Sequence, residues 1–330
     1  MTVADHPTDT RHLVDPELAP ALDAFPPFVF DEETLPLIRA GMSQPAQGAV
    51  DPAESYADVA RQERHVPGAP GDPEVRVLCY EKVGRSSPAA ALLWIHGGGF
   101  VLGTADADDL TCRQLASETG AVVVSVDYRL APETPAPGPL NDCYAALAWA
   151  YGAAPELGLD PTRFLVGGAS AGGGLAACLS LLARDRGDIP ISLQVLIYPM
   201  LDDRTASTVQ PHPYAGEFIW KPSDNRFGWA ALLGGQPGGD DVSPYVAAAR
   251  VPTTADLPAT FISVGSLDLF AEEDIAYATR LIREGVLVEL HVYPGAYHGF
   301  NMVPFARLTQ AYVRDYLDAI NRHLDQRQEA

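Results

Sequence analysis

The sequence has few basic residues and no long hydrophobic run. Among its 330 residues, 22 Lys and Arg stand against 43 Asp and Glu, which gives a formal net charge of −21, and the only lysines are Lys82 and Lys221. Binding to nucleic acid requires clustered basic side chains, so we exclude a nucleic-acid partner. The longest apolar runs, such as residues 121–124, have the length of a strand and fall far short of the ~20 residues that cross a bilayer. We therefore expect no stable membrane association.

Targeting signals and paired cysteines are also missing. The first residues contain no basic stretch followed by an apolar core, which a secretory signal would have. The four cysteines are far apart and include no CxxC pair, which is poor spacing for a metal site; they are Cys79, Cys112, Cys143 and Cys178. We interpret them as small buried side chains in a reducing compartment, with a disulfide as the alternative. These observations predict a cytoplasmic protein.

Hydrophobic residues make up 47% of the chain, which is enough for a large packed core. From about residue 75 onwards, apolar runs alternate with helical patterns. The runs cover residues 75–80, 90–95, 121–128, 163–166, 193–198, 259–264 and 288–293, and the helical patterns cover residues 108–118, 140–151, 171–184, 272–283 and 306–324. Several runs are continuously apolar, as are strands buried on both faces of a parallel sheet. This alternation predicts an α/β fold with a mostly parallel sheet flanked by helices.

Two segments fall outside this alternation. Residues 1–70 are rich in Pro, Asp and Glu, and residues 205–241 combine many turn residues with Trp220, Phe227 and Trp229. We expect both to form a lid over the carboxyl edge of the sheet. The chain then divides into an N-terminal cap segment (1–70), a catalytic domain in two parts (71–204 and 242–330) and a cap insertion (205–241).

Residues 168–172 read Gly-Ala-Ser-Ala-Gly and match the pattern G-x-S-x-G. They lie between the strand predicted at 163–166 and the helix predicted from Ala171. A nucleophile elbow requires this context, because its tight turn needs small residues two positions on either side of the serine. Ser170 is therefore the candidate nucleophile, and an inert serine in a glycine-rich turn is the alternative.

A second glycine motif, His96-Gly-Gly-Gly, follows the apolar run at 90–95 directly. Glycines leave backbone N–H groups open and let the chain approach a ligand closely. In this position they can donate to a developing oxyanion, together with the N–H of Ala171, which follows the candidate nucleophile. The alternative is a phosphate-binding or merely flexible loop, although neither a P-loop lysine nor G-x-G-x-x-G spacing follows.

A serine nucleophile also needs a base and a group that orients the base. Eight histidines are available. His298 lies in a turn after the last predicted strand, where its side chain is free to project over the sheet edge. In contrast, His96 belongs to the glycine motif and His291 lies inside a strand. His298 is therefore the candidate base.

The orienting acid must follow a strand between the serine and the histidine. Asp268 qualifies, as do Asp202 and Asp203. We prefer Asp268, because its strand is adjacent in sequence to the strand that precedes the histidine. Asp202 and Asp203 then read as solvated or capping carboxylates.

Taken in order, these motifs resemble the hormone-sensitive-lipase-like branch of the α/β hydrolases, the bacterial family IV carboxylesterases with an HGGG loop. The resemblance extends from about residue 75 to the end and includes Asp-Tyr-Arg-Leu-Ala-Pro-Glu at 127–133 and Tyr-Pro-Met-Leu-Asp-Asp-Arg at 198–204. It implies an α/β-hydrolase fold, with a mostly parallel eight-stranded sheet and a helical cap. It places the catalytic triad on Ser170, Asp268 and His298, and the oxyanion donors on the N–H groups of Gly98, Gly99 and Ala171.

The resemblance implies a carboxylesterase that acts on a small-molecule ester in two steps. Ser170 is acylated and then released by water, with His298 as base and acid, and no metal or organic cofactor is needed. Hydrolysis of an amide, formamide or lactone by the same triad is the alternative. A non-catalytic receptor on the same fold is a more remote one, since receptors that resemble this family have lost a triad member.

Two further expectations concern substrate size and assembly. Bulky rings over a cleft predict a compact apolar pocket for short to medium acyl chains, and the alternative is that they form only a small core of the lid itself. These rings are Phe25, Phe28, Phe30, Phe218, Trp220, Phe227 and Trp229. Residues 288–293 alternate between apolar and polar side chains, as does a regular last strand with an exposed edge. Proteins that resemble this family often pair through that edge, so we expect a homodimer.

Overall fold

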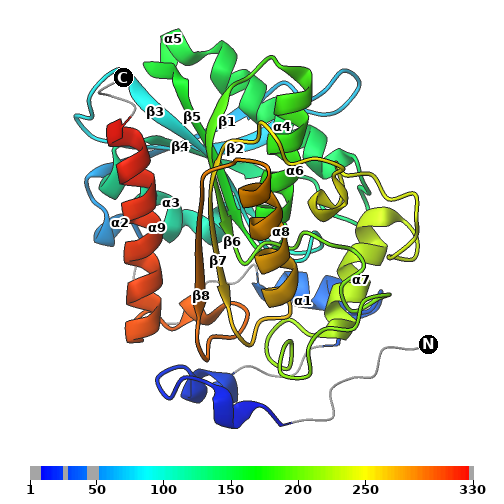
Figure 1. Ribbon diagram of the computed structural model, residues 1–330. Coiled ribbons are helices and arrows are strands. Elements are labelled where there is room, and N and C mark those ends of the chain that lie inside the picture. The colour runs from blue at the N-terminus through cyan, green and yellow to red at the C-terminus, as the bar shows by residue number, and fades with distance from the viewer. Residues whose placement is uncertain (1–8, 25–28, 43–51, 327–330) are drawn as a thin grey trace.

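An eight-stranded sheet forms the centre of the molecule (Figure 1). The computed structural model describes residues 9–24, 29–42 and 52–326. Within them the strands are β1 (Val59–Val66), β2 (Val75–Lys82), β3 (Ala89–Ile95), β4 (Val122–Asp127), β5 (Leu159–Ala169), β6 (Ile191–Ile197), β7 (Ala259–Gly265) and β8 (Val288–Tyr293). Their spatial order is β1-β2-β4-β3-β5-β6-β7-β8; β2 runs antiparallel to β1 and β4, and all other neighbours are parallel. The predicted fold class is confirmed.

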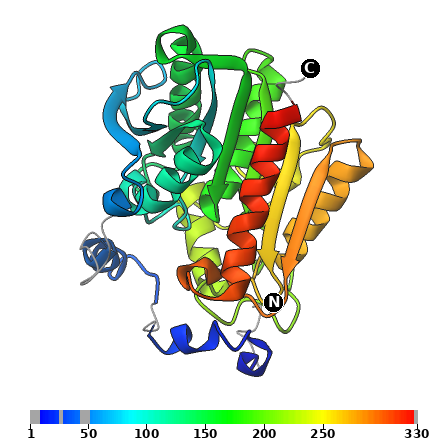
Figure 2. The same ribbon diagram turned by 90° about the vertical axis from the view of Figure 1, so that its left-hand side faces the viewer.

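Helices cover both faces of this sheet (Figures 1 and 2). α3 (Asp109–Thr119) and α9 (Arg307–Gln326) lie on one face, and α4 (Gly138–Gly152), α6 (Ala171–Arg186) and α8 (Ala271–Arg283) lie on the other. All seven residues of β3 are buried. Because successive side chains of a strand point to opposite faces, Leu92 and Trp94 join the core under α3 and α9, whereas Leu93 and Ile95 join the core under α4, α6 and α8. This two-sided burial explains the continuously apolar runs.

The first strand, β1, begins inside the segment that the sequence analysis assigns to the N-terminal cap. Val59–Val66 pair along their whole length with β2, so these residues belong to the sheet. Only the two terminal valines are buried, and residues 61–65 are polar or charged and exposed. Apolar periodicity is therefore absent from this strand, although charged side chains suit an exposed sheet edge.

The segments predicted to form the cap gather at the end of the molecule towards which the parallel strands point (Figures 1 and 2). They include η1 (Arg11–Leu13), η2 (Ala19–Ala24), α1 (Leu35–Met42) and α7 (Pro222–Leu233). Phe25 and Phe28, two of the predicted lid aromatics, lie outside the described residues. The remaining short helices are α2 (Pro52–Ser55), α5 (Ala154–Leu157), η3 (Ala105–Asp108), η4 (Ala248–Arg250) and η5 (Phe300–Met302).

Two further expectations can be compared with the structure. In the described ranges, no helix combines the length and the apolar character that a membrane span requires. All four cysteines are free thiols, so the structure contains no disulfide among them. Cys112, Cys143 and Cys178 are buried, as predicted, while Cys79 is half-buried.

Candidate active site

Ser170 occupies a strained turn between β5 and α6. Its backbone has φ 57° and ψ −121°, a conformation that residues other than glycine rarely adopt. The two flanking glycines allow this turn to sit against the end of β3. A Cβ atom on Gly168 or Gly172 would lie 2.5 Å or 2.0 Å from the carbonyl oxygen of Ile95. The spacing of small residues in the motif is therefore a packing requirement.

The structure brings the three predicted triad residues together. Ser170 Oγ lies 3.0 Å from His298 Nε2, and His298 Nδ1 lies 2.8 Å from Asp268 Oδ2. Asp268 follows β7 and is fully buried; Ser170 and His298 are 6% and 7% exposed. Because an ionised carboxylate only accepts hydrogen bonds, the proton on the neutral ring belongs on Nδ1. The lone pair of Nε2 then faces the serine hydroxyl.

The two other candidate acids have different partners. Asp203 is fully buried, accepts hydrogen bonds from Arg250 Nε and Nη2 at 2.5 and 2.9 Å, and also accepts one from the N–H of Gly238. The prediction that Asp203 is solvated or a cap is therefore wrong, because its cationic partner comes from a distant part of the chain. Asp202 pairs with Arg204 and accepts a hydrogen bond from the N–H of that residue, which is a capping role.

Aromatic rings that sequence reasoning missed surround the imidazole of His298. The ring centroids of Tyr198 and Phe270 lie 4.7 and 5.2 Å from that of His298, both edge-to-face. The hydroxyl of Tyr198 donates to Oδ1 of Asn301 at 2.8 Å, in the segment that follows the histidine. Tyr198 and Phe270 stand next to predicted elements, at the end of a strand and after Asp268, but nothing in their local sequence indicates this contact.

In the glycine loop, the carbonyl groups of Gly98 and Phe100 accept backbone hydrogen bonds. Gly98, Gly99 and Phe100 have consecutive positive φ angles of 117°, 59° and 67°. The carbonyl of Gly98 accepts from the N–H groups of Val101 and Leu102, and that of Phe100 accepts from Ala131. In the part of the chain that the structure describes, the N–H groups of Gly98, Gly99 and Ala171 donate no hydrogen bond.

The side chain of His96 contacts the backbone of the glycine loop and helps to hold it in place. Its Nδ1 lies 2.8 Å from the carbonyl oxygen of Gly97, and its ring stacks on Tyr128 at 4.2 Å. The hydroxyl of Tyr128 donates to the carbonyl of His96. Burial lowers the pKa of His96, so its imidazole is neutral and donates from Nδ1. His96 thus belongs to the loop, as the sequence analysis expects.

Trp220, from the predicted cap insertion, closes the site over the loop. A Cβ atom on Gly99 would lie only 2.1 Å from the ring of Trp220. The same indole lies 6.4 Å from the imidazole of His298 and 5.7 Å from the ring of Phe30, measured between centroids. Its Nε1 donates to Oδ1 of Asn225 at 3.2 Å. Trp220 therefore lies directly against the glycine loop and close to the imidazole of His298.

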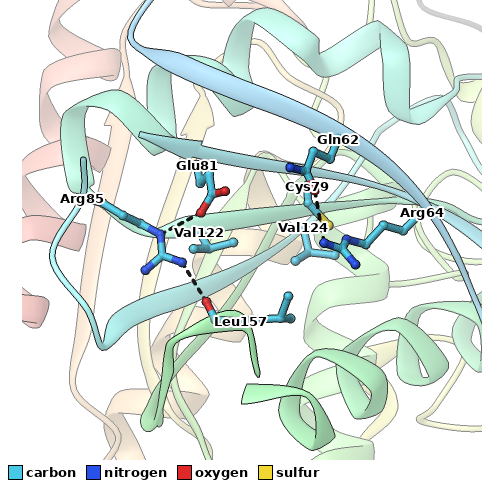
Figure 3. A pocket seen from close by; sticks show the side chains of 8 residues that line it. All are labelled: Gln62, Arg64, Cys79, Glu81, Arg85, Val122, Val124 and Leu157. Carbon is cyan, nitrogen blue, oxygen red and sulfur yellow. Dashed lines mark hydrogen bonds and ion pairs between the residues drawn. The ribbon is translucent and has the colours of Figure 1, made fainter. Parts of the chain in front are cut away.

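A separate small pocket, with a cavity volume of about 30 Å³, lies on the antiparallel part of the sheet (Figure 3). Its lining comes from β1, β2, β4, α5 and the turn after β2, and it contains none of the triad residues. Arg85 spans its edge, donating to Glu81 and to the carbonyl of Leu157 (Figure 3). Burial raises the pKa of the Cys79 thiol in this pocket to about 11, so the thiol is protonated and a poor nucleophile at neutral pH.

The mostly parallel sheet, with an elbow after β5 and contacts among Ser170, His298 and Asp268, has the arrangement of an α/β-hydrolase fold. The family described as "alpha/beta hydrolase fold" matches residues 92–302. The chain is 33% identical over 301 residues to esterase LipI of Mycobacterium tuberculosis, covering 91% of this chain and 92% of the relative. It is 35% identical over 313 residues to carboxylesterase NlhH of the same organism, covering 92% and 93%.

Structural comparison agrees with these relatives. A solved structure titled bacterial heroin esterase superposes with a TM-score of 0.86 at 40% identity, covering 96% of this chain and 99% of that one. The chain therefore belongs to the α/β-hydrolase family, in its hormone-sensitive-lipase-like branch of carboxylesterases.

Proposed function

We propose that this protein hydrolyses carboxylic esters through a covalent acyl-Ser170 intermediate. The observation that carries the proposal is the continuous chain of contacts from Ser170 Oγ through His298 to Asp268. The esterase names of relatives that align over nine-tenths of the chain support the same reaction class. The carboxylate and the two ring nitrogens have the roles that this chemistry requires.

The first step is acylation. His298 Nε2 removes the Ser170 proton while Oγ attacks the ester carbonyl carbon, and the electron pair of the carbonyl moves to its oxygen. The open N–H groups of Gly98, Gly99 and Ala171 stabilise this oxyanion; loss of one such donor typically costs about 10²–10³ in rate. The intermediate collapses, and His298 gives its proton to the departing alkoxide.

Deacylation repeats the sequence with water. Nε2 takes a proton from the attacking water, a second oxyanion forms, and Ser170 leaves with the proton from the imidazole. Asp268 keeps the imidazole in the required tautomer and stabilises its protonated form in both steps. Its second oxygen, Oδ1, accepts from the N–H of Phe270 at 3.0 Å, which fixes the carboxylate plane.

We also propose that the substrates carry short to medium acyl chains. The support is the close cover over the site, where Trp220 contacts Phe30 and the glycine loop. An aromatic wall at this distance favours a compact apolar pocket over an open groove. The compartment that we propose is the reducing cytoplasm, in keeping with four free thiols.

The proposed function is tested by labelling with a fluorophosphonate. The reagent should add its phosphonyl mass to the peptide that contains Ser170, and activity on p-nitrophenyl butyrate should be lost in parallel. Ser170→Ala should neither hydrolyse the ester nor be labelled. Ser180→Ala, which changes a buried serine on α6, the helix that follows Ser170, serves as the control and should retain both properties. Labelling at another residue, or full activity of Ser170→Ala, would overturn the proposal.

A further inference from the structure

Arg39 of α1 has hydrogen bonds to three residues in two other segments of the chain. Arg39 Nε donates to the carbonyl of Val101 at 2.8 Å, and Nη2 donates to the carbonyl of Ala131 at 2.8 Å. The same guanidinium pairs with both carboxylate oxygens of Glu133, at 2.7 and 3.1 Å. The planar fork of arginine allows these contacts at once, which a lysine could not reproduce.

Both carbonyl partners of Arg39 belong to the support of the glycine loop. Val101 directly follows the three residues with positive φ, and its N–H closes the turn onto the carbonyl of Gly98. Ala131 holds the same turn from the other side, because its N–H donates to the carbonyl of Phe100 at 3.0 Å. Arg39 therefore connects the two segments that set the position of Gly98 and Gly99.

The contacts lie at the edge of a small apolar cluster. Leu35 of α1 packs there with Val101, Leu102 and Ala131, all four of them buried. The side chain of Arg39 is 26% exposed, while that of Glu133 is 64% exposed. A partly buried carbonyl that loses its donor costs free energy, whereas an exposed ion pair contributes little. The two carbonyl contacts therefore matter more than the pairing with Glu133.

We propose that Arg39 is a positioning residue that couples the placement of α1 to the geometry of the oxyanion loop. The inference rests on the proposed function, since it assigns Gly98 and Gly99 to the oxyanion. A misplaced loop weakens contacts that exist only in the transition state, so kcat falls while KM changes little. A role limited to cap stability would instead lower the melting temperature without this kinetic signature.

The test measures kcat, KM and melting temperature for Arg39→Ala, Arg39→Lys and Glu133→Gln. A fourth measurement is the inhibition constant of an alkyl trifluoromethyl ketone, to which the serine adds to give an oxyanion that mimics the intermediate. For Arg39→Ala we expect kcat to fall roughly tenfold or more, which is a smaller decrease than the complete loss of one oxyanion donor causes. The inhibition constant of the ketone should rise by a similar factor. Glu133→Gln should lose no more than about threefold, since a pair this exposed contributes little.

Arg11→Ala is the matched control. Arg11 also combines a carboxylate, Asp23, with a backbone carbonyl, that of Ala19, but both contacts stay within the N-terminal segment. This variant should match wild type in all four measurements. Added methylguanidinium should restore part of the activity of Arg39→Ala and leave Arg11→Ala unchanged.

Wild-type kcat and wild-type inhibitor affinity in Arg39→Ala would overturn the inference, as would an effect confined to KM. If Arg39→Ala does not fold, Arg39→Lys takes its place in the test. We then expect the kcat of Arg39→Lys to fall further than that of Glu133→Gln but less than loss of an oxyanion donor would cause. A wild-type kcat in Arg39→Lys would overturn the inference. These outcomes differ from failure of the proposed function, in which the wild-type enzyme itself would not be labelled at Ser170.

Discussion

In the proposed triad, the acid is the residue that the sequence alone identifies least clearly. Asp268 contacts His298 Nδ1 at 2.8 Å, whereas Asp202 is engaged by Arg204. We expect Asp268→Asn to lose about 10⁴ in kcat, because the amide favours the wrong imidazole tautomer. Asp202→Asn should retain activity within about threefold, because among the described residues the carboxylate of Asp202 contacts Arg204 and neither Ser170 nor His298. Steady-state kinetics on one p-nitrophenyl ester decide this, and a crippled Asp202→Asn beside a near-normal Asp268→Asn would reverse the assignment.

A second acid near the site affects stability instead. Asp274 on α8 is fully buried, and neither carboxylate oxygen has a hydrogen-bond partner among the described residues. Burial, reinforced by the neighbouring carboxylates of Glu273 and Asp268, raises the pKa of Asp274 well above its ordinary range. The folded state thus keeps a proton that the unfolded chain releases above about pH 4, and the free energy of unfolding falls as pH rises.

Asp274→Asn replaces the protonated acid by a group of the same shape that does not titrate. We expect the variant to gain stability relative to wild type as pH rises from about 5 to about 9, which urea unfolding at three pH values will show. Glu272→Gln, on the exposed side of the same helix, is the control and should run parallel to wild type. A constant difference between Asp274→Asn and wild type across this range would contradict the expectation.

Residues whose roles depend on local sequence could be predicted, and residues whose roles depend on distant partners could not. Ser170 lies in a turn defined by its own neighbours, and the predicted base and acid each follow a strand. Arg39, by contrast, meets Val101 and Glu133 across 62 and 94 positions, and Asp203 meets Arg250 across 47. Nothing in the local pattern of these residues encodes such pairings.

At the scale of elements, the cap insertion determines the space beside Ser170. Trp220 lies between Phe30 of the N-terminal segment and the imidazole of His298, and it is 6% exposed. A smaller side chain at this position should enlarge the site. Each further methylene that becomes buried contributes about 0.8 kcal/mol until the pocket is full.

We therefore expect wild-type kcat/KM to peak between about C2 and C8 in an acyl series of p-nitrophenyl esters, and Trp220→Leu to move the peak to longer chains. Trp229→Phe is the control, because Trp229 lies on α7, shortly after Trp220, but its ring packs on that of Phe100, with the centroids 5.1 Å apart. Undiminished activity of wild type on palmitate esters, or an unmoved peak in Trp220→Leu, would show that Trp220 does not limit the chain.

Among the strands, too, those with a pattern in their own sequence could be predicted, whereas the one positioned only by a neighbouring strand could not. Strands β2 to β8 each contain an apolar run that the sequence shows, and several of these runs are continuously apolar because parallel strands are buried on both faces. Strand β1 lacks any such signal, since residues 61–65 face solvent and are polar. The position of β1 is determined by its backbone pairing with β2, and the polar side chains of β1 allow this pairing but give no sequence pattern from which to predict it.

At the scale of the whole molecule, the sheet topology explains why distant motifs meet. Ser170, Asp268 and His298 follow β5, β7 and β8, and the glycine loop follows β3. These strands are parallel within one sheet, so all four segments emerge at the same edge. Ligand sites of open parallel sheets form at this edge. The four segments of the predicted site therefore meet only because their strands belong to one continuous sheet.

The two outer strands of that sheet differ in their capacity to pair with a second copy. The free side of β1 carries exposed charged residues, which discourage pairing. In β8, residues 288–291 are partly buried and Val292 is 41% exposed, and within the described residues its pairing partner is β7 alone. We propose a homodimer in which β8 pairs with its two-fold copy.

Light scattering at micromolar concentration should then give about twice the 35.2 kDa of one chain. Val292→Lys should shift the mass towards the monomer, because a lysine on an edge strand opposes pairing, whereas Val83→Lys, at a 69% exposed position after β2, should not. Each copy carries a formal charge of −21, so the two copies repel, and added salt should strengthen the wild-type dimer by screening that repulsion. A wild-type mass near 35 kDa at both low and high salt would exclude pairing through β8.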